Sequence, residues 1–176
     1  GFGLSSILLT AHRRESFGEP LRSICRAIGR LAADFGQYQF VFSVHPNPTV
    51  VATVEEFLGS YSGKNLSLVG PLTYPEFVKT MMSSELILSD SGGVQEEAPS
   101  LGVPVLLLRG CTERPEGITA GATKIVGTDE DRIVEAFREL LPDGPEYRKM
   151  AQARNPYGYG KASRRIVKEC VGFLRG

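Results

Sequence analysis

The stretch that decides the fold is residues 86–109, LILSDSGGVQEEAPSLGVPVLLLR. Two short runs without a charged side chain, 86–89 and 105–108, enclose a more polar segment. Runs that are apolar throughout are typical of parallel strands buried on both faces of a sheet, and a segment between two such strands is usually a helix. We therefore predict strands at both runs and a helix over 94–101. Pro99 should kink or end that helix, because proline cannot donate the helical hydrogen bond.

The same alternation continues on both sides of this stretch. Apolar runs predict further strands at 6–11, 40–44, 66–69 and 123–126. Apolar residues at helical spacing predict helices at 20–35, 49–58, 75–82, 129–141, 145–153 and 161–174. Strands separated by helices predict an α/β fold with a Rossmann-like, doubly wound parallel sheet, here as one domain over residues 1–176. Ligands of such sheets bind at the carboxyl ends of the strands, so the strand-to-helix loops hold the candidate site.

Composition narrows the function classes. Lys plus Arg and Asp plus Glu number 20 each, which gives no support for a nucleic-acid partner or a membrane surface. No apolar run approaches the roughly 20 residues of a membrane helix. The three cysteines, Cys25, Cys111 and Cys170, show no metal-finger spacing, so we expect no metal site. Their odd number argues against a disulfide framework, so we expect a location in the reducing cytoplasm. Cys25 and Cys170 fall on predicted apolar helix faces, and the start at Gly1, without Met, suggests a fragment boundary.

The loop after the 86–89 strand is the leading candidate for a phosphate site. Ser91, Gly92 and Gly93 open the predicted helix, where free N–H groups and the positive end of the helix dipole favour an anion. Glu97 follows one turn later, where its carboxylate suits the two hydroxyls of a ribose. The alternative is a turn capped by Asp90 or Ser91, followed by solvated glutamates.

Other loops at the same edge carry further candidates. After the first strand, His12 and Arg13 suit an anionic ligand, although a solvated basic turn explains them equally well. His45 follows the second strand and either lines the cleft or is held by a backbone bond. Arg114 lies in a TERPE stretch that also reads as a salt-bridged surface loop, and Phe77 either packs in the core or stacks on a flat base.

Six stretches together resemble one known family. They are TAHRRESFGEPL, VHPNP, DSGGVQEEAPSLGVPVLLLR, TERPEG, VGTD and NPYGYGKAS, and they run from about Ile7 to Ser163. They resemble the C-terminal half of the bacterial non-hydrolysing UDP-N-acetylglucosamine 2-epimerases. The resemblance implies a glycosyltransferase-B (GT-B) type fold, with two Rossmann-like domains and the active site between them. This chain would be the second domain without its N-terminal partner, and residues 160–174 would be the final helix that crosses back to the first domain.

The resemblance also implies a role for each matched residue. The proposed catalytic histidine is His12, and the activator-site positions are Arg13 and His45. The residues that would bind UDP are Ser91, Gly92 and Gly93 at the diphosphate, Glu97 at the ribose, Phe77 at the uracil and Arg114 at the phosphate end.

The implied reaction interconverts UDP-N-acetylglucosamine and UDP-N-acetylmannosamine by elimination and re-addition of UDP, without metal or cofactor. A homodimer is expected for the full-length protein, and the isolated half should be inactive. Alternatives are a UDP-sugar glycosyltransferase domain and a non-catalytic nucleotide-sugar-binding module. Five positions differ from the residues usual in the family, and they concern the rim of the site and its activator region. They are Gly110, Cys111, Arg154, Tyr159 and Pro46.

Overall fold

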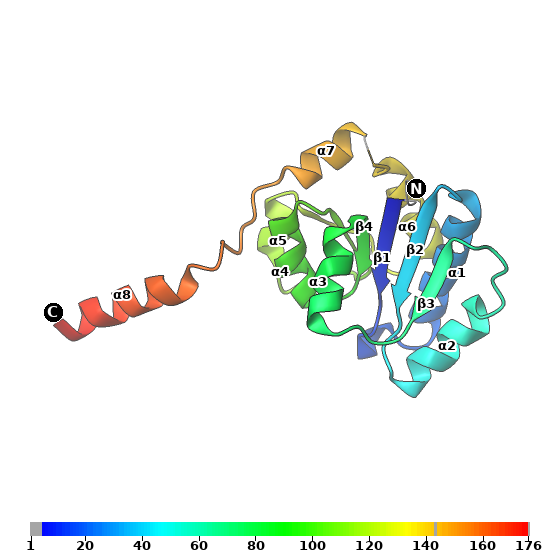
Figure 1. Ribbon diagram of the computed structural model, residues 1–176, viewed down its shortest axis with the longest axis horizontal. Coiled ribbons are helices and arrows are strands. Elements are labelled where there is room, and N and C mark those ends of the chain that lie inside the picture. The colour runs from blue at the N-terminus through cyan, green and yellow to red at the C-terminus, as the bar shows by residue number, and fades with distance from the viewer. Residues whose placement is uncertain (1–4, 143, 176) are drawn as a thin grey trace.

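The computed structural model describes residues 5–142 and 144–175, which form a parallel sheet with helices on both faces (Figure 1). Its six strands lie in the order β3-β2-β1-β4-β5-β6. The Rossmann-like, doubly wound sheet predicted from the sequence is therefore confirmed, and each strand lies within two residues of its predicted bounds. The strands are β1 (Ser5–Thr10), β2 (Tyr38–Ser43), β3 (Leu66–Val69), β4 (Ser84–Ser89), β5 (Val105–Leu107) and β6 (Thr123–Ile125).

The helices form two layers, one on each face of the sheet (Figure 1). One layer consists of α1 (Glu19–Asp34), α2 (Pro48–Leu58) and α6 (Glu130–Glu139). The other consists of α3 (Tyr74–Met82), α4 (Gly92–Leu101) and α5 (Pro115–Thr119). The remaining helical segments are the 3-10 turn η1 (Arg14–Ser16), α7 (Pro145–Ala151) and α8 (Ala162–Arg175).

The two faces of the sheet bury cores of different size. In β1, Ile7 and Leu9 join the larger core under α1, α2 and α6, whereas Leu8 joins the smaller core under α3 and α4. This alternation follows from the two-residue period of a strand. In the larger core, the ring centroid of Phe137 lies 5.0 Å from that of Phe35 and 5.9 Å from that of Phe40. Among the described residues the larger core holds 25 buried side chains and the smaller holds seven.

The strand order reverses between β1 and β4, which places two loops side by side. Thr10 pairs with Ser89 at the ends of these strands, and the Asp90 N–H donates to the Thr10 carbonyl at 3.3 Å. The chain then leaves in opposite directions, to α1 on one face and to α4 on the other. A crevice at such a switch point is the usual ligand site of an open parallel sheet.

One sequence expectation needs correction, and two short segments were missed. Helix α4 runs to Leu101 and ends at Gly102, whose φ of 69° is left-handed, so Pro99 does not end it. One lost hydrogen bond near the end of a helix is offset here by burial, since Ala98 and Pro99 are both buried. The short segments η1 and α5 were not predicted at all.

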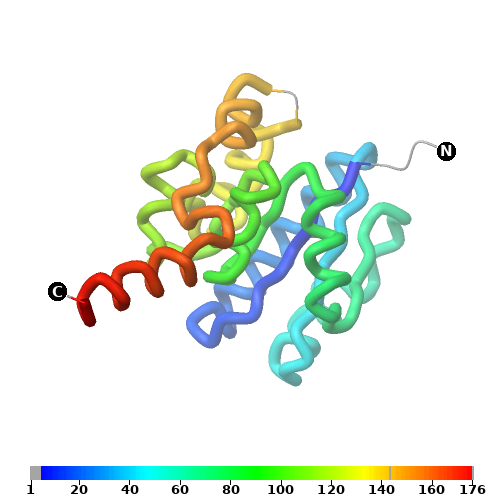
Figure 2. The backbone as a smooth tube through the Cα atoms, turned by 60° about the vertical axis from the view of Figure 1, so that its left-hand side comes forward, coloured from blue at the N-terminus to red at the C-terminus, as the bar shows by residue number. Residues whose placement is uncertain are grey.

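Helix α8 extends away from the body of the molecule (Figures 1 and 2). The helix is amphipathic as predicted, but its apolar face is not buried. Ile166, Phe173 and Leu174 are 62%, 87% and 81% exposed. Cys170 shares this exposure, whereas Cys25 is buried in α1 as expected. Over the described ranges, every helix is too short or too polar to traverse a lipid bilayer.

Candidate functional site

The first turn of α4 leaves its backbone donors free for a ligand. Ser91 is the N-cap residue, and within the described residues no side chain makes a capping bond there. The capped-turn reading of this loop therefore does not describe the structure. The Ser91 N–H instead donates to Ser89 Oγ at 2.9 Å, which fixes the backbone as it leaves β4. Unpaired N–H groups at the positive end of a helix dipole form a ready anion site.

Two guanidinium groups lie close to Gly92. A Cβ atom placed on Gly92 would lie 3.3 Å from Arg13 Nη2 and 3.4 Å from Arg114 Cζ. Because Gly92 has no Cβ, the guanidinium groups of Arg13 and Arg114 can occupy the space beside its backbone. Arg114 is held by an ion pair with Glu96, and the hydrogen bond to that carboxylate raises the pKa of Arg114. Two cations beside free helix donors form a strongly anion-attracting corner.

Asp90 ties the loop after β1 to the end of β4. Its Oδ2 accepts hydrogen bonds from the backbone N–H groups of His12 and Arg13, both at 2.8 Å, and from Ser16 Oγ at 3.3 Å. The side chain is fully buried. The sequence reading considered Asp90 only as a helix cap. Its signal was an acidic residue directly after a buried strand, where an unpaired charge would be costly.

A cavity of about 170 Å³ brings together candidates from three loops and from helix α3. His12, His45, Phe77 and Ser91 all line it. The rings of His12 and His45 stack with centroids 5.4 Å apart and an interplanar angle of 15°. Phe77 is half-buried and packs against the smaller core, which supports its core reading, while its stacking on a flat base stays a prediction. His45 also receives the Asn47 N–H on Nδ1 at 3.2 Å.

Glu97 lies one turn into α4, on the side of α3. The Tyr74 hydroxyl donates to Glu97 Oε2 at 3.1 Å, and that bond raises the pKa of Tyr74. Glu97 Oε1 lies 3.9 Å from the position of a Cβ on Gly93, so it faces the open side of the glycine pair. Gly93 itself is exposed.

The TERPE stretch divides between two environments. Arg109, only 5% exposed, forms a bidentate pair with Glu113 at 2.9 Å and also contacts Glu15 at 2.6 Å. This part is the salt-bridged loop of the alternative reading, and the Arg109 guanidinium lowers the pKa of Glu113 to about 2. Arg114 instead turns to α4, as described above. Tyr157 reaches this region from the chain beyond α7 and accepts the Gly117 N–H at 3.0 Å.

Most residues that depart from the family wording lie outside the His12 cavity. Gly110 and Cys111 line a separate cavity beside Arg109, and Cys111 is exposed. Arg154 and Tyr159 line another cavity near the start of α8. Pro46 alone lines the cavity that contains His12.

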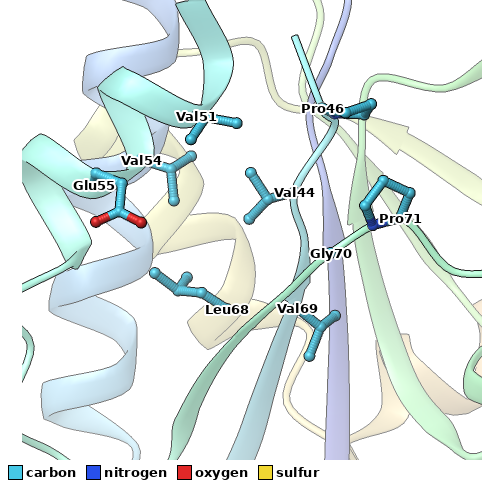
Figure 3. A pocket seen from close by; sticks show the side chains of 9 residues that line it. All are labelled: Val44, Pro46, Val51, Val54, Glu55, Leu68, Val69, Gly70 and Pro71. Atoms are coloured by element: carbon cyan, nitrogen blue, oxygen red, sulfur yellow. The ribbon is translucent and has the colours of Figure 1, made fainter. Parts of the chain in front are cut away.

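A larger apolar cavity of about 360 Å³ lies beside the His12 cavity, between α2 and the ends of β2 and β3 (Figure 3). The two cavities share Val44, Pro46 and Pro71. Aliphatic side chains line the larger one, and Glu55 supplies the one charged group among them (Figure 3). Because two histidines and Ser91 line the smaller cavity, whereas Glu55 brings a negative charge to the larger one, we assign the candidate site to the smaller cavity.

Comparisons with known proteins agree with this geometry. Residues 4–170 match the family model of the UDP-N-acetylglucosamine 2-epimerases. The chain is 52% identical over 165 residues to a UDP-N-acetylglucosamine 2-epimerase of Bacillus subtilis, covering 94% of this chain and 43% of that protein.

Solved structures show the same relation in three dimensions. The Neisseria meningitidis UDP-GlcNAc 2-epimerase bound to UDP-GlcNAc superposes with a TM-score of 0.90 at 46% identity, over 96% of this chain and 45% of that one. The Staphylococcus aureus MnaA structure with UDP gives a TM-score of 0.91 at 43% identity, over 97% and 46%.

The chain thus spans less than half the length of these relatives and corresponds to their C-terminal half. Its sheet is the C-terminal Rossmann-like half of a GT-B type fold, as the resemblance implied. The sequence match, the shared fold and the polar cavity at the strand switch point lead to one conclusion: this chain belongs to the UDP-N-acetylglucosamine 2-epimerase family.

Proposed function

We propose that this chain is the UDP-binding half of an isomerase that interconverts UDP-N-acetylglucosamine and UDP-N-acetylmannosamine. The observation that carries the proposal is the anion corner at the start of α4, where the guanidinium groups of Arg13 and Arg114 lie close to Gly92 beside free helix donors. A diphosphate is the part of UDP that such a corner suits. Relatives that share the fold are bound to UDP and to UDP-GlcNAc in their structures.

The cavity suggests where each part of the nucleotide binds. The diphosphate would lie on Ser91, Gly92 and Gly93, next to Arg114. The uracil would lie against Phe77, which lines the same cavity as Ser91. The ribose would meet Glu97, whose carboxylate Tyr74 orients.

The chemistry proposed for the site is elimination of UDP, which breaks the bond from C1 to the diphosphate oxygen and removes the proton of C2. UDP then adds back to C1, and a proton returns to the other face of C2. The leaving diphosphate gains negative charge, and the helix start, Arg114 and His12 are arranged to stabilise it. Removal of the C2 proton needs a base. We assign the carboxylates that move this proton to an N-terminal domain that lies outside this chain. His45 and Arg13, which lie at the rim beside His12, are proposed to contact a second, activating UDP-sugar.

The exposed apolar face of α8 supports a partner domain. Ile166, Val167, Phe173 and Leu174 form this face and are 60–87% exposed. We propose that α8 packs on the N-terminal domain of the full-length protein, which would then form a homodimer. A cytoplasmic location fits the free thiols of Cys25, Cys111 and Cys170.

Isothermal titration of the chain with UDP tests the proposed function. Gly92→Ala should weaken UDP binding at least tenfold, because the new methyl group would crowd the Arg13 and Arg114 guanidinium groups and displace them. Gly93→Ala serves as the matched control, because its Cβ would meet no atom closer than 3.9 Å and the loss should be smaller. Absence of UDP binding by the folded wild-type chain would refute the proposal.

A further inference from the structure

We propose that Asp90 is a positioning residue that holds the His12 imidazole with a proton on Nδ1 and leaves Nε2 to act in the cleft. This inference deepens the proposed function and rests on it, because His12 is the histidine assigned to the leaving diphosphate. It assigns a task to a fully buried carboxylate. Nδ1 of His12 lies 3.5 Å from Asp90 Oδ1.

The two oxygens of Asp90 have different surroundings. Oδ2 accepts three hydrogen bonds, from the His12 and Arg13 N–H groups and from Ser16 Oγ. Oδ1 is buried and has no hydrogen-bond partner within the described residues. A buried carboxylate oxygen without a donor is costly, and such atoms are rare in folded proteins. The His12 ring nitrogen at 3.5 Å is placed to become its donor after a small movement.

Two contacts of His12 Nδ1 decide where the proton lies. One is Asp90 Oδ1, which can only accept, and the other is Thr10 Oγ1 at 3.3 Å, which can accept or donate. A lone pair on Nδ1 would face the negative carboxylate, whereas an N–H there is attracted to both oxygens. The neutral ring is therefore expected to carry its proton on Nδ1, since the partner of one ring nitrogen sets the tautomer of the other.

This arrangement gives His12 a defined direction. With Nδ1–H turned to Asp90, the lone pair of Nε2 is presented away from the carboxylate. In the doubly protonated ring, Nε2–H donates to an oxygen of the diphosphate, and Asp90 balances the charge from the other side. Among the described residues that line the cavity, His45 is the other titratable group, and the guanidinium of Arg13, which follows His12 in the chain, lies near Gly92.

The second histidine supplies an internal reference. His45 Nδ1 accepts the Asn47 N–H at 3.2 Å, so a neutral His45 carries its proton on Nε2. The chain has two histidines in total. The two rings are thus predicted to be opposite tautomers in one spectrum.

The test is a long-range ¹H–¹⁵N correlation spectrum of the chain labelled at histidine. It is recorded as a pH series, and the tautomers are read where the ¹⁵N shifts themselves show that both rings are neutral. We expect one ring protonated on Nδ1 and one on Nε2, with His45→Gln removing the Nε2–H signals. Two rings protonated on Nε2 in the wild-type chain would overturn the inference.

Asp90→Asn separates positioning from structure. Because three donors point at Oδ2, the amide oxygen takes that place and the NH₂ group faces His12 Nδ1. The variant should keep the loop and switch His12 to the Nε2–H tautomer, as the equivalent change does in a serine protease triad. Ser16→Ala is the matched control, since it removes one Oδ2 contact and should leave the tautomer unchanged.

Thr10→Val tests the competing cause. A switch of His12 in Thr10→Val with none in Asp90→Asn would show that the hydroxyl sets the tautomer, which contradicts the inference. If Asp90→Asn does not fold, the wild-type and Thr10→Val spectra still decide the question. UDP titration keeps the two proposals apart. Failure to bind UDP with Nδ1–H present counts against the proposed function alone, and binding with Nε2–H present counts against Asp90 alone.

Discussion

Replacing Glu97 with alanine tests the nucleotide site at the residue proposed to hold the ribose. The carboxylate is half-buried, with Oε2 engaged by Tyr74 at 3.1 Å and Oε1 facing the open side of Gly93. One charged oxygen is therefore free for the ligand hydroxyls. Hydrogen bonds to charged groups contribute about 1.5–3 kcal/mol, and partial exposure lowers the expected loss to about 1–3 kcal/mol. That loss corresponds to a roughly 5- to 150-fold rise in the Kd for UDP.

The assay is isothermal titration of the wild type and Glu97→Ala with UDP and with 2′,3′-dideoxy-UDP. The loss should appear with UDP and vanish with the dideoxy ligand, which has no ribose hydroxyls to bind. Glu146→Ala, on α7, removes the same charge away from the site and should leave both affinities unchanged. Tyr74→Phe should cost less than Glu97→Ala, because it only frees the carboxylate to move. An equal loss with both ligands, or no loss at all, would refute the assignment of Glu97 to the ribose.

Two further predictions concern titration and thiol reactivity. Arg109 lowers the pKa of Glu113 to about 2, so the pair stabilises the fold above pH 4.5 and loses that effect as the pH falls toward 2. Glu113→Gln should therefore unfold at lower urea than the wild type at pH 7, and a gap that did not narrow between pH 4.5 and 2 would contradict this cause. Burial raises the pKa of the Cys25 thiol to about 12, whereas Cys111 and Cys170 are exposed. A thiol reagent at pH 8 should modify two cysteines in the folded chain and the third only after unfolding; three fast thiols would show that α1 is not packed as described.

The long helices could be predicted because burial of one face imposes a helical period on the sequence, and the strands because burial on both faces leaves short runs without a charged side chain. The runs at 86–89 and 105–108 are of this second kind, and the structure buries them between two helix layers. The predicted last residue of α4, Leu101, is confirmed, and Gly102 follows it in the left-handed conformation. The expectation that Pro99 could end the helix was wrong, because Pro99 lies inside α4. The segments η1 and α5 are three and five residues long, too short to show a period.

The candidate site was predictable where one loop carries its own chemistry. Ser91, Gly92 and Gly93 directly follow a strand, so their position at a helix start could be inferred from local order. The task of Asp90 could not, because its partners lie 74–78 residues earlier in the chain and meet it only through the pairing of β1 with β4. For the same reason, the sequence did not show that Glu113 pairs with Arg109 while Arg114 turns to α4. Whether Arg109 or Arg114 faces α4 depends on tertiary packing.

The unequal cores have a consequence for the motions of the site. Phe77 and Glu97 stand on α3 and α4, which rest on the smaller core, while α1, α2 and α6 rest on the larger one. Segments with fewer buried apolar contacts open at lower free energy than the rest of a domain. Amide hydrogens of α3 and α4 should therefore exchange with solvent before those of α1. Helices α3 and α4, which would contact the nucleotide, are therefore expected to move on binding, while α1, α2 and α6 keep their positions.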